Sequence, residues 1–173
     1  LIPGRTYYLF VENGDGSGQG YASFYFIRHY VGNFWYGFVE EEDATNTGRN
    51  DTYENAEIVH YFDDLPNYYF IDGNLAGGTD VDWFRLPSSG STYAYIECYA
   101  QRSGSGLRDF KAELYRASGG APVSLVASAT ETATQDLFAI GNAPAGQYLL
   151  KLSAGSLASG IAGDHYRCSV LFL

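Results

Sequence analysis

Methionine is absent from this chain, and lysine and arginine number only ten against twenty aspartate and glutamate residues. The net charge of −10 repels phosphate backbones, so we expect no nucleic-acid partner. No apolar run reaches the roughly 18 residues that cross a bilayer, so we expect no membrane insertion. Because position 1 is leucine, we also expect that translation starts upstream of it.

Catalytic motifs are missing as well. The sequence has no nucleophile elbow, no HExxH and no paired Cys/His spacing of the kind that hydrolases and zinc sites use. Its histidines, His29, His60 and His165, lie in strand-like contexts. The sequence therefore predicts a protein that is not an enzyme.

What the chain does have is typical of an extracellular β protein. It contains 21 glycines, 16 tyrosines and 11 phenylalanines, and only 17% of its residues are charged. Aromatic residues favour strands and glycines favour turns. Strand-like runs separated by Gly/Pro turns, without a helical period, predict an all-β, antiparallel β-sandwich.

The two ends of the chain resemble each other. Residues 1–32 align with residues 142–173 without a gap, with five identities, which indicates a tandem repeat. We therefore expect residues 1–32 to be the last two strands of an incomplete preceding repeat, 33–49 an aromatic and acidic linker, and 50–173 a complete sandwich. Two isolated strands are marginal in water, so we expect a neighbouring repeat or an identical subunit to cover them.

Acidic residues and cysteines mark two further features. Residues 40–82 hold twelve acidic residues and one base, Arg49, so this stretch carries −11 and the remainder nets +1. Concentrated carboxylates either stay solvated or bind a hard cation.

Cys98 and Cys168 both lie in strand-like runs. In an exported protein they would form a disulfide, and the alternative is two separately buried thiols.

The order of motifs resembles the bacterial pre-peptidase C-terminal domain, a family that includes the collagen-binding domains of secreted collagenases. The motifs that carry the resemblance are Asn50-Asp51-Thr52, Asp80-Val81-Asp82-Trp83-Phe84, the strand Asp109 to Tyr115, and Pro144 to Leu152. The resemblance implies a jelly-roll-like β-sandwich appended to an exported protein.

The same resemblance implies calcium near the linker, bound by the opening acidic motif and the Asp-x-Asp pair. The matching residues are Asn50, Asp51, Asp80 and Asp82. Gly48 and Arg49 stand where the family often has Glu and Pro, which removes one carboxylate. The alternative is that Asn50 and Asp51 cap a turn while the aspartates are solvated.

Tyrosines indicate a binding face. Tyr93, Tyr95 and Tyr99 fall on one side of a predicted strand, and Tyr68, Tyr69 and Phe70 lie on another. Exposed, they would grip an extracellular polymer such as collagen or a polysaccharide. The alternative is that they form cross-strand pairs or are covered by the next repeat.

Two functions follow from these observations. The leading hypothesis is a non-catalytic extracellular module of a secreted or surface protein, acting in attachment, spacing or stability, with calcium at the linker. The second is a structural subunit of an extracellular filament, assembled by strand addition through residues 1–32.

Overall fold

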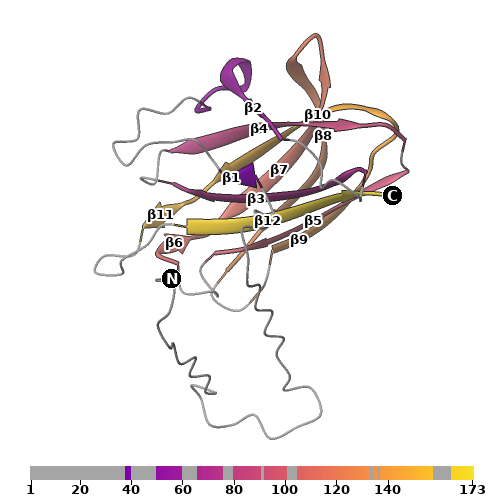
Figure 1. Ribbon diagram of the computed structural model, residues 1–173. Coiled ribbons are helices and arrows are strands. Elements are labelled where there is room, and N and C mark those ends of the chain that lie inside the picture. The colour runs from indigo at the N-terminus through magenta and orange to yellow at the C-terminus, as the bar shows by residue number, and fades with distance from the viewer. Residues whose placement is uncertain are drawn as a thin grey trace, which may run out of the picture. The chain divides into compact units, whose positions relative to one another are not determined.

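Two β-sheets face each other in the computed structural model, and a short two-stranded ribbon flanks them (Figure 1). The structure describes residues 38–39, 50–59, 66–75, 80–90, 92–100, 105–132, 135, 137–157 and 165–173. All of them belong to the unit Trp35–Leu173. Residues 1–32, predicted to end a preceding repeat, lie outside the described residues, as does most of the predicted linker 33–49.

Sheet A has five strands, and its pairing is antiparallel except between β1 and β3. Their order is β1 (Phe38–Val39), β3 (Tyr68–Asn74), β12 (His165–Phe172), β5 (Tyr93–Tyr99) and β9 (Leu137–Asn142).

Sheet B also has five strands and is antiparallel except between β2 and β4. Their order is β2 (Glu57–Ile58), β4 (Val81–Ser88), β10 (Gly146–Ser153), β7 (Lys111–Ser118) and β8 (Ala121–Thr130). The ribbon pairs β11 (Ser156–Leu157) with β6 (Leu107–Arg108), and one 3-10 turn, η1, spans Tyr53–Asn55. The predicted all-β sandwich is confirmed.

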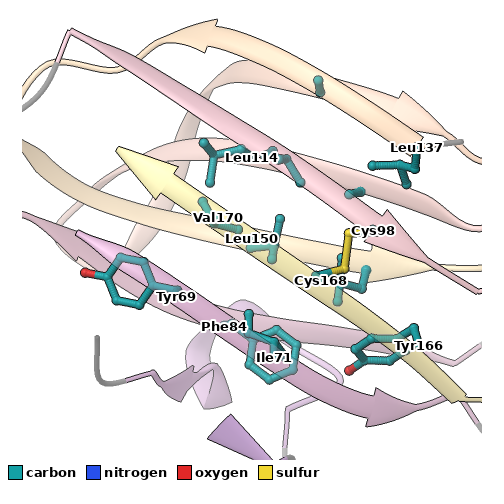
Figure 2. Close-up of a cluster of buried hydrophobic side chains, with 14 of the residues drawn as sticks. Tyr69, Ile71, Phe84, Cys98, Leu114, Leu137, Leu150, Tyr166, Cys168 and Val170 are labelled. Carbon is teal, nitrogen blue, oxygen red and sulfur yellow. A yellow bond between two sulfur atoms is a disulfide. The ribbon is translucent and has the colours of Figure 1, made fainter. Parts of the chain in front are cut away.

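Alternation along each strand builds the core. In β5 the small apolar residues Ala94, Ile96 and Cys98 point inward, while the tyrosines and Glu97 point outward, as the sequence pattern predicts. The inward residues of both sheets form one buried cluster, which contains Phe84, Leu114 and Leu150 from sheet B (Figure 2).

Buried tyrosines connect the two sheets. The Tyr69 hydroxyl in sheet A donates a hydrogen bond to the Pro87 carbonyl in sheet B. The Tyr166 hydroxyl donates to Asp82 Oδ2 over 2.5 Å, and its ring stacks on Phe110. These bonds give buried hydroxyl groups the partners that they need in a water-free core.

A disulfide joins Cys98 of β5 to Cys168 of β12, directly opposite each other in the register of sheet A (Figure 2). It therefore links neighbouring strands of one sheet rather than the two sheets. Both cysteines are fully buried, and the described residues include no free cysteine.

Glycines are required at two places. Gly119 and Gly120 have positive φ angles of 59° and 86° and close the hairpin between β7 and β8, as two-residue hairpin turns require. At Gly141 in β9, a Cβ atom would overlap the carbonyl oxygen of Val126 in β8. The two sheets therefore converge closely at the β8–β9 corner.

Candidate functional site

The outer face of sheet A carries aromatic side chains on three of its strands. Cross-strand register places Tyr68 and Tyr95 on either side of Leu171, and Ile140 lies beyond Tyr95 on β9. We call this surface the aromatic platform. Its members share an outward orientation: Tyr68, Phe70, Tyr93, Tyr95, Tyr99, Phe138, Ile140 and Leu171.

Several of these side chains are open to solvent. Tyr93 is 48% exposed, Phe138 55% and Ile140 51%. Exposed apolar surface of this extent across neighbouring strands is uncommon on soluble proteins and marks interaction sites. The platform is therefore the strongest candidate for a binding surface among the described residues.

Rings on the platform are tilted against one another. Tyr68 and Phe70 have ring centroids 4.6 Å apart at an interplanar angle of 61°, and Tyr95 and Phe138 lie 6.4 Å apart at 44°. The first pair lies along one strand, β3, and the second joins the neighbouring strands β5 and β9, where such a contact stabilises the sheet.

One end of the platform is polar. Arg167 donates from Nε to Asp72 Oδ1 over 2.5 Å and from Nη2 to Oδ2 over 3.0 Å, and this hydrogen bonding raises the pKa of Arg167. The Tyr99 hydroxyl donates to Glu97 Oε1 over 2.5 Å. The platform thus offers apolar contact together with fixed charged groups, the combination that protein interfaces use.

The predicted tyrosines Tyr93, Tyr95 and Tyr99 all lie on this platform, with Tyr95 half-buried between its neighbours. Tyr68, Tyr69 and Phe70 lie on one strand, β3, as predicted, but Tyr69 does not belong to the outer face. Tyr69 points inward and is fully buried, because neighbouring residues of a strand face opposite sides of the sheet.

Sequence reasoning missed Phe138, Ile140 and Leu171. In β9 the residues Leu137 and Ala139 point inward, and they are as apolar as the outward Phe138 and Ile140. A run that is apolar on both sides carries no alternation, so its outward face cannot be identified without the partner strand.

The outer face of sheet B is covered instead. Arg85 Nη2 donates to the carbonyl groups of Tyr53 and Glu54 in the η1 turn over 3.3 and 3.0 Å. The Tyr53 ring contacts Trp83 at 6.1 Å, and Trp83 contacts Tyr115 at 5.8 Å. This arrangement covers the part of that face around Trp83, whereas Ile58 of β2 and Leu125 of β8, at its two edges, are 58% and 54% exposed.

Two outward residues of sheet B, Leu149 and Glu113, are buried beneath neighbouring side chains. Leu149 points outward from β10, yet it is only 1% exposed. Glu113 forms ion pairs with Lys111 at 2.7 Å and Lys151 at 3.5 Å. Burial alone would raise the pKa of Glu113, but hydrogen bonding and charge from Lys111, with the charge of Lys151, lower it overall.

The predicted calcium residues gather at the start of β4. The Asn50 backbone carbonyl accepts a hydrogen bond over 2.9 Å from the N–H of Trp83, the residue that follows Asp82 in β4. Asn50, Asp80 and Asp82 are all buried. Desolvation, a hydrogen bond with Asp80 and the negative charge of Asp80 raise the pKa of Asp51, so these two carboxyl groups lie close together.

The donor atoms fit calcium in type. Calcium takes about six to eight oxygen ligands, and carboxylate and amide oxygens are suitable ones. Among the described residues, no three aspartate, glutamate, histidine or cysteine side chains form a group able to hold a metal ion. Glu40 to Asp43, the further acidic residues of the predicted linker, lie outside the described residues.

Nothing in the described part of the chain resembles a catalytic centre. His165 is exposed on the outer side of β12, and His29 and His60 lie outside the described residues. No helix formed by the described residues has the length and apolar character to span a membrane.

Neither a protein-family model nor a curated protein matches the chain. Among solved structures, the pre-peptidase C-terminal domain of a Bacillus anthracis collagenase is similar, with 16% identity over 66% of this chain and 93% of that chain and a TM-score of 0.43. The Aeromonas hydrophila PliG protein, a periplasmic inhibitor of g-type lysozyme, is also similar, with 14% identity over 68% of this chain and 99% of that chain and a TM-score of 0.44.

A β-1,3-glucan-binding CBM6 from Bacillus halodurans is similar with 12% identity over 68% of this chain and 98% of that chain and a TM-score of 0.32. These are resemblances of chain trace at low identity. They assign neither a family nor a function to this chain.

Proposed function

We propose that this chain is a non-catalytic binding module of an exported protein, and that the aromatic platform attaches it to an extracellular polymer such as collagen or a polysaccharide. The observation that carries the proposal is the solvent-exposed set of aromatic rings on the outer face of sheet A. Aromatic side chains supply much of the energy at interfaces.

The disulfide supports an extracellular location. Disulfides persist in oxidising compartments and are rare in the cytosol, and both cysteines of this chain take part in one. A buried cross-link also suits a module that works outside the cell, where it meets proteases and no chaperones.

Binding to insoluble polymers tests the platform. Fibrillar collagen and an insoluble β-glucan are incubated with the wild type, and the bound fraction is measured after sedimentation. The variant Tyr93→Ala/Tyr99→Ala should lose about tenfold in affinity for the polymer that binds, since two interface aromatics are truncated.

A control variant, Val123→Ala, changes a residue of β8 that is 59% exposed, and it should bind as the wild type does. Loss of binding in the control together with the tyrosine variant would place the contact elsewhere. If neither polymer retains the wild type, the attachment role to these polymers is overturned.

Calcium is the second part of the proposal: Asn50, Asp51, Asp80 and Asp82 would hold the ion at the base of the linker. A bound cation there would relieve the repulsion between Asp51 and Asp80. Titration of the metal-free chain with calcium chloride should give binding heat and a higher melting temperature. Asp80→Asn should abolish both, whereas a wild type that responds to neither measurement contains no such site.

A further inference from the structure

Strand β9 forms one edge of sheet A (Figure 1). It has two exposed apolar side chains, Phe138 and Ile140. All six of its residues, Leu137–Asn142, are uncharged and none is proline. Edge strands present unpaired backbone groups, and proteins usually protect them with charges, prolines, bulges or short length.

The other edges of this sandwich carry such protection. The edge strands β1 and β2 are two residues long. The edge strand β8 contains Pro122, and its pairing with β7 is interrupted by two register shifts. Of the four edge strands in the two sheets, β9 alone has none of these features within the described residues.

The direction in which the backbone groups of β9 point follows from the hydrogen bonds that β5 makes on its other side. Tyr93 N–H donates to the Leu173 carbonyl over 2.9 Å, and Leu173 N–H donates back to Tyr93 over 2.8 Å. The backbone N–H and C=O groups of Tyr93 and of every second residue after it in β5 therefore point toward β12. Those of Ala94 and Ile96 point toward β9.

In the β5–β9 register, Ala94 lies opposite Gly141 and Ile96 opposite Ala139. Gly141 and Ala139 thus use their backbone groups on β5, and the N–H and C=O groups of Phe138 and Ile140 point away from it. The same two residues therefore combine an exposed apolar side chain with a backbone donor and acceptor that do not pair with β5.

We propose that β9 pairs with β9 of a second copy of this chain, antiparallel, across a two-fold axis that passes beside Ala139. This arrangement sets Phe138 of each copy opposite Ile140 of the other and satisfies both backbone pairs at once. Such an isologous contact is closed, so it yields a dimer rather than a fibre. It goes beyond the proposed attachment role and does not depend on it.

Charge is compatible with pairing at this edge. The excess of acidic residues lies in residues 40–82, which carry −11, whereas β9 carries no charge. Glu97 is on β5, and the β5 strands of the two copies would be three strand spacings apart, about 14 Å. That exceeds the Debye length of about 8 Å at physiological salt, so repulsion between the copies is screened.

The dimer would join two sheets A into one continuous sheet. Both aromatic platforms would then lie on neighbouring parts of that sheet, so a polymer could contact both at once. Two linked sites raise apparent affinity without any new contact.

Sedimentation equilibrium of the full chain tests the proposal. Between about 1 µM and 1 mM, spanning common interface affinities, the wild type should rise from the chain mass of 19.0 kDa to twice that mass. Ile140→Pro removes the outward-facing N–H without removing a donor that pairs with β5, which edge strands tolerate, and should weaken dimerisation at least tenfold. Ile140→Val keeps the donor and the β-branched side chain and should dimerise as the wild type does.

A second variant covers the case in which proline disturbs the fold. Phe138→Lys keeps every backbone bond and places a charge at the edge, so it should also remain monomeric while its near-ultraviolet circular dichroism is unchanged. A wild type that stays monomeric over the whole range overturns the proposal. So does an assembly that persists in Phe138→Lys, which would place the contact on another surface, such as residues 1–32.

Discussion

The outer faces of both sheets carry aromatic residues, but those at the centre of sheet B are packed under the η1 turn, whereas several of those on sheet A are about half exposed. Sheet B presents Trp83 and Tyr115, and the η1 turn packs over them through Tyr53 and the Arg85 hydrogen bonds. Sheet A presents tyrosines and phenylalanine, of which Tyr93 and Phe138 are largely exposed. Aromatic content therefore does not distinguish a structural face from a candidate binding face; what packs above it does.

The largest expected effect concerns the cross-link that sheet A has and sheet B lacks among the described residues. Replacing Cys98 and Cys168 by alanine releases a loop with a sequence separation of 70 residues. In the chain-entropy model this lowers the free energy of unfolding by about 4 kcal/mol. Urea unfolding of the oxidised wild type and the double variant measures the difference, and equal midpoints would show that sheet A does not depend on the disulfide.

A second experiment compares one aromatic residue from each face. Trp83→Ala should reduce the free energy of unfolding by about 3 kcal/mol, because it removes a large ring packed between Tyr53 and Tyr115. Tyr93→Ala should cost less, about 0.5 kcal/mol, because Tyr93 is 48% exposed and leaves a smaller cavity. Both values come from urea unfolding at one pH; similar losses would mean that the platform is structural after all.

The smallest expected change in the free energy of unfolding comes from replacing one glutamate on each outer face, Glu113 on sheet B and Glu97 on sheet A. Glu113 has a pKa below its ordinary value of 4.5, so its stabilising contribution is complete above that value and is lost as pH falls through the folded-state pKa. Glu113→Gln should therefore cost about 1 kcal/mol at pH 7 and almost nothing near pH 3. Unfolding curves at several pH values check this.

The matched control is Glu97→Gln on the platform. Its side chain is exposed, so the free energy of unfolding should change by less than about 0.5 kcal/mol at either pH. A pH-dependent loss in this control as large as that of Glu113→Gln would remove the contrast between the two faces.

The strand pattern and the outward side of β5 could be predicted from the sequence. Alternation in Tyr93–Tyr99 identified both the inward and the outward residues of β5, because the side-chain period of a strand is two. Gly119 and Gly120 marked a hairpin turn, since glycine tolerates positive φ. Calcium binding and the repeat formed by residues 1–32 stay predictions.

Other features depended on partners far away in the chain. Tyr69 and Phe70 are adjacent and both aromatic, and only the pairing of β3 with β12 decides which of them faces the core. Cys98 meets Cys168 because β5 and β12 are neighbours, and Trp83 is covered because η1 packs on β4. Local sequence therefore determined which segments became strands and which side chains alternate, whereas tertiary packing decided which outward aromatic residues are covered, because coverage depends on contacts between distant segments.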